Sequence, residues 1–95
     1  MRIISVLLIL VLIMPTLVLA QGNPTDDRIY DDVRRKLADD PDVRGAGLNV
    51  TVKGGKVILE GRVHEEVGRQ KATRIAKRVK NVTGVENKIK LFSEN

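Results

Sequence analysis

The 95-residue chain has no cysteine and no tryptophan, and only one histidine, one tyrosine and one phenylalanine. Without cysteine it can form no disulfide, no thiolate zinc site and no cysteine nucleophile. One histidine excludes a metal site built from several histidines, and so few aromatic rings leave few platforms for stacking on single-stranded nucleic acid. We therefore expect no metal, no cofactor and no nucleic acid ligand.

The sequence does have a net charge of +5 and a long apolar run near its N-terminus. After Arg2, residues 3–14 are apolar except for Ser5, and Pro15 then precedes a short segment that ends at Ala20. This order is typical of a secretory signal peptide. We expect residues 1–20 to be a cleaved signal peptide and the protein to be periplasmic or secreted. The alternative is an uncleaved anchor helix, since the run is almost long enough to span a bilayer.

The mature chain begins with a polar, turn-rich segment, residues 21–25, which we expect to be a flexible leader. A helical pattern follows, with Thr25 or Asp26 as its N-cap. Its apolar residues recur with a spacing of four, and Asp40-Pro41 should end it. We place one domain at residues 26–92 and a frayed C-terminus at residues 93–95. The apolar residues of this first helix are Ile29, Val33 and Leu37.

The remaining helices and strands are predicted from changes in the spacing of the apolar residues. Residues 48–53 and 56–63 alternate apolar and polar side chains around Gly54-Gly55, which predicts a β-hairpin. Glu65-Glu66 opens a second helix, and residues 85–92 form a last strand. The order predicts an α+β fold: an αββαβ two-layer sandwich with two helices on one face of a three-stranded mixed sheet. The buried stripe of the second helix should comprise Gly68, Ala72, Ile75, Ala76 and Val79.

Three stretches of this chain resemble the BON domain family (bacterial OsmY and nodulation). They are Ile29-x3-Val33-x3-Leu37 with its acidic tail, Val50-x-Val52-x-Gly54-Gly55-x-Val57-x-Leu59-x-Gly61-x-Val63, and Ala72-x3-Ala76-x2-Val79 followed by Val82-x2-Val85-x-Asn87-x-Ile89-x-Leu91. Asn81 stands where the family has glycine, and asparagine is the next most tolerant residue in a left-handed turn. The resemblance implies a periplasmic or envelope protein that interacts with phospholipid, in envelope maintenance or the response to osmotic stress.

The solvent-facing arc of the second helix is the first candidate site. Basic side chains across such an arc can contact an anionic bilayer, although a charged solvated face is the simpler explanation. We expect a non-catalytic module that associates with anionic phospholipid membranes. The basic residues are Arg69, Lys71, Arg74, Lys77, Arg78 and Lys80.

The sheet face without helices is the second candidate site, because it contains apolar residues where water is expected. The alternative function is a protein–protein interaction module of the cell envelope, which self-associates or binds a partner through this face. Single exposed apolar residues are nevertheless common on monomers. The candidates are Ile58, Arg62, Lys88, Lys90 and Phe92.

No residues in the sequence form a convincing catalytic group. His64 next to Glu65-Glu66 suggests an acid–base or metal trio, but a lone histidine between a strand and a helix is more often a surface residue. Acid–base catalysis needs paired groups in a cleft, for which so small a domain has little room. We therefore expect no enzymatic activity.

Overall fold

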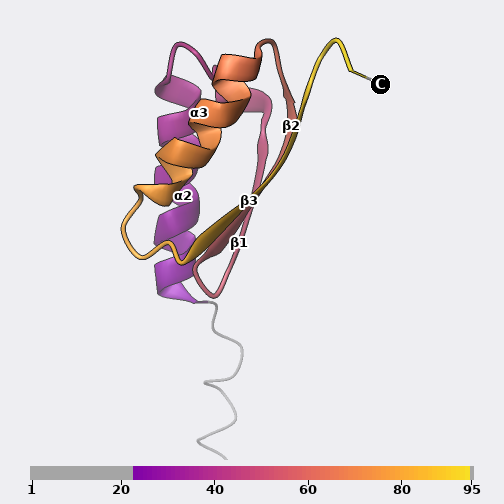
Figure 1. Cartoon of the computed structure of the whole chain (residues 1–95). Helices are drawn as coiled ribbons and strands as arrows, with labels where there is room; N and C mark the ends of the chain where they lie inside the picture. The colour runs from indigo at the N-terminus through magenta and orange to yellow at the C-terminus, as the bar shows by residue number, and fades with distance from the viewer. Residues whose placement is uncertain (1–22, 95) are drawn as a thin grey trace, which may run out of the picture.

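The computed structural model describes residues 23–94, shown in Figure 1. The expected signal peptide, residues 21–22 of the expected leader and Asn95 lie outside the described residues. The elements are helix α2 (Pro24–Asp39), the short 3₁₀ helix η2 (Gly45–Gly47), strands β1 (Asn49–Lys53) and β2 (Lys56–Val63), helix α3 (Glu66–Lys77) and strand β3 (Gly84–Leu91).

Helix α2 begins at Pro24, earlier than the sequence predicted. The side-chain oxygen of Asn23 accepts hydrogen bonds from the backbone amides of Thr25 and Asp26, at 3.0 and 3.3 Å, and so caps the helix. Pro24 suits the first helical position, because its missing N–H needs no partner there. The last residues of the expected leader therefore belong to the helix. Asp40 ends it in an extended conformation, as the following proline requires.

The sheet is mixed, with strand order β1-β2-β3. Strands β1 and β2 form an antiparallel hairpin, and β2 pairs with β3 in parallel after the crossover through α3. Gly54 and Gly55 both have positive φ, +56° and +83°, which is the backbone that a two-residue hairpin turn of this kind demands. The predicted αββαβ order and the predicted hairpin are confirmed.

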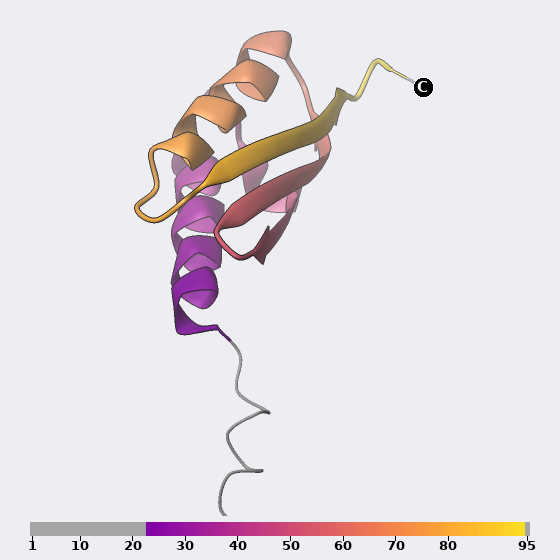
Figure 2. The same cartoon turned by 60° about the horizontal axis from the view of Figure 1, so that its bottom comes forward.

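Both helices cover the same face of the sheet, and the core lies between the two layers (Figure 2). Val33, Leu37, Val57 and Leu59 are completely buried there. The thirteen buried apolar residues of the described chain lie between Ile29 and Ile89 and form one cluster. None of the helices in this part of the chain is long and apolar enough to cross a membrane.

Candidate functional site

Helix α3 packs closely on the rest of the domain through small residues. Gly68, Ala72 and Ala76 are buried, and a Cβ at Gly68 would collide with the backbone carbonyl of Asp42. The helix therefore lies against the loop after α2 as closely as its backbone permits. Its opposite side, which holds the predicted basic arc, faces away from the core.

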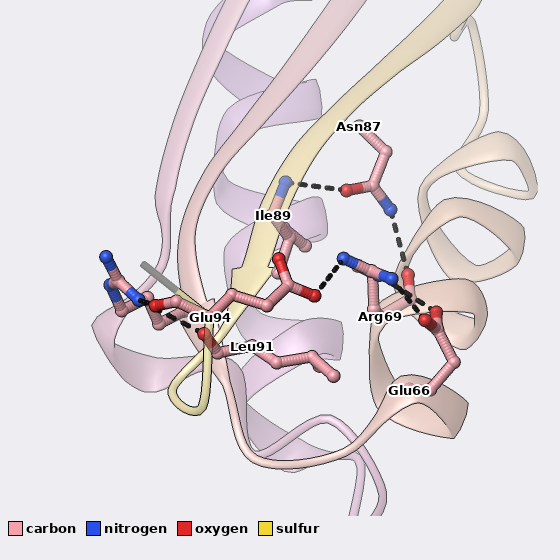
Figure 3. A network of polar contacts seen from close by, with 7 residues as sticks. Glu66, Arg69, Asn87, Ile89, Leu91 and Glu94 are labelled. Carbon is pink, nitrogen blue, oxygen red and sulfur yellow. Dashed lines mark hydrogen bonds and ion pairs between the residues drawn. The ribbon is translucent and has the colours of Figure 1, made fainter.

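Arg69, the first residue of the predicted basic arc, forms ion pairs within the domain. Its guanidinium binds the Glu66 carboxylate and, at 3.0 Å, the carboxylate of Glu94 in the C-terminal tail (Figure 3). The contact with Glu66 lowers the pKa of that carboxyl and raises the pKa of Arg69. Arg69 thus ties α3 to the C-terminal tail, and its charge is largely neutralised.

Asn87 lies beside Arg69 and links β3 to α3. Its Nδ2 donates to Thr73 Oγ1 at 2.7 Å. The same Nδ2 also donates to the Arg69 carbonyl at 2.8 Å, while the Asn87 Oδ1 accepts from the amide of Ile89 (Figure 3). That amide would otherwise point away from β2 along the free edge of the sheet. In the sequence Asn87 is recognisable only as part of the family pattern, which does not indicate these contacts.

Lys71 is the second residue of the arc that is engaged within the domain. Its Nζ lies 2.9 Å from a carboxylate oxygen of Asp40 and 2.9 Å from one of Asp42. Hydrogen bonds to Asp42 and then Asp40 raise the pKa of Lys71, and the bond from Lys71 is the main cause of the lowered pKa of Asp40. Lys71 therefore holds α3 to the acidic loop after α2.

The other four residues of the arc are exposed and have no carboxylate partner among residues 23–94. They lie in the second half of α3 and in the turn that follows it. One of them, Arg78, also lines an open groove of about 410 Å³ between α2 and α3, whose other lining residues are Lys36, Asp39, Asp40, Pro41 and Ile75. We call these four residues, Arg74, Lys77, Arg78 and Lys80, the α3 basic cluster.

The helix-free face of the sheet is also rich in basic residues. Lys56 and Lys88 both contact Glu86, at 3.2 and 3.4 Å, and these contacts lower the pKa of the Glu86 carboxyl. Lys53 and Lys90 have no carboxylate partner among the described residues. Arg62 does not face a carboxylate; its Nη1 donates to the carbonyls of Leu91 and Glu94, at 3.1 and 2.7 Å.

The two apolar candidates on this face differ in exposure. Ile58 is half-buried in the central strand. Phe92 is 58% exposed and lies just after the end of β3, which stops at Leu91 instead of including Phe92 as expected. Its ring packs on that of His64, with centroids 4.7 Å apart. His64 therefore belongs to a surface aromatic pair, and residues 23–94 contain no cluster of three or more metal-ligand side chains.

The comparisons with known proteins agree with this architecture. The BON domain family model matches residues 25–91, most of the chain, so the protein belongs to the BON domain family. No curated protein matches the chain. BON domains are non-catalytic binding modules, associated with membrane and phospholipid binding and commonly found in periplasmic or envelope proteins that include osmotic-stress proteins.

Proposed function

We propose that this protein is a non-catalytic envelope module that binds anionic phospholipid surfaces through the α3 basic cluster. The observation that favours this function is the contrast within the helix. Arg69 and Lys71 form ion pairs with carboxylates inside the domain. The four cations of the cluster are exposed and have no carboxylate partner among the described residues. A solvated group of four cations is free to exchange its counterions for lipid headgroups.

The expected affinity is modest and depends on salt. Each basic residue near an anionic bilayer contributes about 1 kcal/mol, so four give a reversible attachment rather than a permanent one. Because the residues stay in water, added salt screens the attraction over a Debye length of about 8–10 Å at physiological ionic strength. We propose that the exported protein, in the periplasm or outside the cell, uses this attachment in envelope maintenance or under osmotic stress.

Co-sedimentation with vesicles tests this function. Residues 21–95, the chain expected after removal of the signal peptide, are mixed with vesicles containing phosphatidylglycerol and with neutral phosphatidylcholine vesicles. The variant Arg74→Gln/Lys77→Gln/Lys80→Gln should bind the anionic vesicles on the order of 100-fold more weakly than the wild type. Equal binding of the wild type to both kinds of vesicle would show that the proposal is wrong.

A matched control removes the same amount of charge from the other helix of the same layer, α2. Arg28, Arg34 and Arg35 lie on α2, and changing all three to glutamine also removes three positive charges. This control should bind anionic vesicles with nearly the affinity of the wild type. If both triple variants lose affinity equally, net charge and not the α3 basic cluster determines binding.

A further inference from the structure

The outer face of the sheet is a second cationic surface, separate from the α3 basic cluster. By strand alternation its charged side chains come from all three strands, and the register sets Arg62 directly beside Lys90 and Lys53 directly beside Lys56. Like charges placed opposite each other repel, unless an anion or a local acceptor lies between them. This face carries five basic residues (Lys53, Lys56, Arg62, Lys88 and Lys90) and two carboxylates (Glu60 and Glu86). Lys56 and Lys88 share Glu86, and Arg62 donates to two backbone carbonyls, so Lys53 and Lys90 are the cations of this face without a partner among residues 23–94.

The two cationic surfaces point in opposite directions. Helix α3 lies on one face of the sheet, and the second surface is the other face of the same sheet (Figures 1 and 2). The side chains of the α3 basic cluster are exposed. A flat bilayer that contacts the outside of α3 cannot also lie along the opposite face of the sheet. Membrane binding through α3 therefore leaves the second surface in solution.

We propose that the outer sheet face binds a second anionic bilayer, so that one domain bridges two membrane surfaces. This inference rests on the proposed function of α3 and adds a partner for the opposite face. The excess of positive charge favours an anionic surface and disfavours a second copy packed face to face, because that arrangement would place like charges together. Lys53 and Lys90, which have no carboxylate partner among residues 23–94, lie near opposite ends of this face.

Phe92 gives this face an apolar contact with lipid. It is the most exposed large apolar residue of the described chain, at 58%, and it lies two residues after Lys90. An aromatic ring beside basic side chains suits the boundary between headgroups and acyl chains. The Phe92 ring packs on that of His64, the residue directly after β2, with centroids 4.7 Å apart.

Vesicle clustering measures bridging directly. Residues 21–95 are added to phosphatidylglycerol-containing vesicles, and turbidity and particle size by dynamic light scattering are followed beside co-sedimentation. The wild type should bind and cluster the vesicles. The sheet-face variant Lys53→Gln/Lys88→Gln/Lys90→Gln should still bind, but should need on the order of tenfold or more protein to produce the same turbidity. The α2 control, Arg28→Gln/Arg34→Gln/Arg35→Gln, should cluster as the wild type does.

The outcomes separate the two proposals. If the wild type does not sediment with anionic vesicles, the proposed function fails. If it sediments but does not cluster them, or if the sheet-face variant clusters them as well as the wild type, only the bridging proposal is overturned. Sedimentation velocity of the lipid-free protein gives the remaining outcome. A dimer that the sheet-face substitutions dissociate would show that the sheet face binds another copy and not a membrane.

Discussion

The carboxylate of Asp26, in the first turn of α2, accepts a hydrogen bond from the backbone amide of Gly55 in the β1–β2 turn, at 2.9 Å. Its other oxygen accepts from the amide of Gly54 at 2.8 Å. The same turn is bound from its other side, where the Gly55 carbonyl accepts from the amide of Thr83 at 2.9 Å. The tip of the hairpin is therefore held between the start of α2 and the loop that leads to β3.

Replacing Asp26 should destabilise the domain, because both glycine amides would lose their acceptor at once. We expect Asp26→Ala to lower the free energy of unfolding by about 1–3 kcal/mol, since the amide of Gly55 is partly buried. Asp26→Asn retains one acceptor oxygen but sets an NH2 donor against the other glycine amide, so it should also destabilise the domain. Urea denaturation followed by circular dichroism measures both values.

Asp27→Ala is the control for this effect. Asp27 is also an acidic residue in the first turn of α2, so its removal costs the same favourable interaction with the helix dipole, about 0.3–1 kcal/mol. If Asp26→Ala costs no more than Asp27→Ala, the hydrogen bonds to the hairpin turn contribute nothing measurable.

Gly68 tests how closely α3 approaches the loop after α2. Helix propensity alone predicts that Gly68→Ala stabilises the domain by about 1 kcal/mol. The new Cβ, however, would collide with the backbone carbonyl of Asp42, which cannot rotate aside as a side chain can. We expect this steric collision to outweigh the gain in helix propensity. The free energy of unfolding, measured by thermal or urea denaturation, should fall by about 1–3 kcal/mol.

Gly47→Ala is the matched substitution for Gly68→Ala. A Cβ at Gly47 would have no heavy atom within 4 Å, and its φ is not positive. The change should alter stability by less than about 0.5 kcal/mol. A stabilising Gly68→Ala would mean that α3 can move away from the loop without cost.

The contact between Lys71 and Asp40 should make stability depend on pH in acid. Because the pKa of Asp40 is lowered below its ordinary 3.8, the folded state favours the ionised carboxylate. The contribution is complete above that ordinary value and is lost as pH falls through the lower pKa of the folded state. For Lys71, whose pKa is raised above 10.5, the contribution is present below that value and is lost in strong base.

Urea denaturation between about pH 5 and pH 2 measures this dependence. The variant Lys71→Met should lose less stability over this range than the wild type does. Glu66 and Glu86, whose pKa values are also lowered, remain in both proteins, so their effects cancel in the difference. Lys77→Met removes an exposed cation of the same helix and should follow the wild-type curve. If stability depends on pH identically in all three proteins, the contact between Lys71 and Asp40 does not cause the loss of stability in acid.

Periodicity predicted which residues of this chain lie inside and which lie outside. The spacing of Ile29, Val33 and Leu37 and the alternation along β2 both depend on local geometry, so they can be deduced without knowing the rest of the fold. Contacts between distant segments cannot be deduced in this way. Asp26 and Gly55 are 29 residues apart, as are Lys71 and Asp42, and nothing in the spacing of their segments pairs them.

The same limit applies to the candidate sites. Helical spacing predicted six cations on the solvent-facing arc of the second helix. Only the folded chain distinguishes Arg69 and Lys71, which have internal partners, from the α3 basic cluster. Likewise, alternation predicted the outer face of the sheet, whereas the sharing of Glu86 between Lys56 and Lys88 depends on the parallel register of β2 and β3.

Asn81 is the residue at which a backbone prediction from the sequence can be tested most directly. Its φ is +72°, the left-handed conformation expected where the family has glycine. Asn81→Gly should therefore change the free energy of unfolding by no more than a few tenths of a kcal/mol, whereas Asn81→Val should cost about 1–2 kcal/mol because a branched Cβ is strained there. Lys80→Val, in the same turn but without positive φ, should cost less than about 0.5 kcal/mol. Equal losses for the two valine variants would show that β-branching in the turn, and not the left-handed backbone at Asn81, determines the cost.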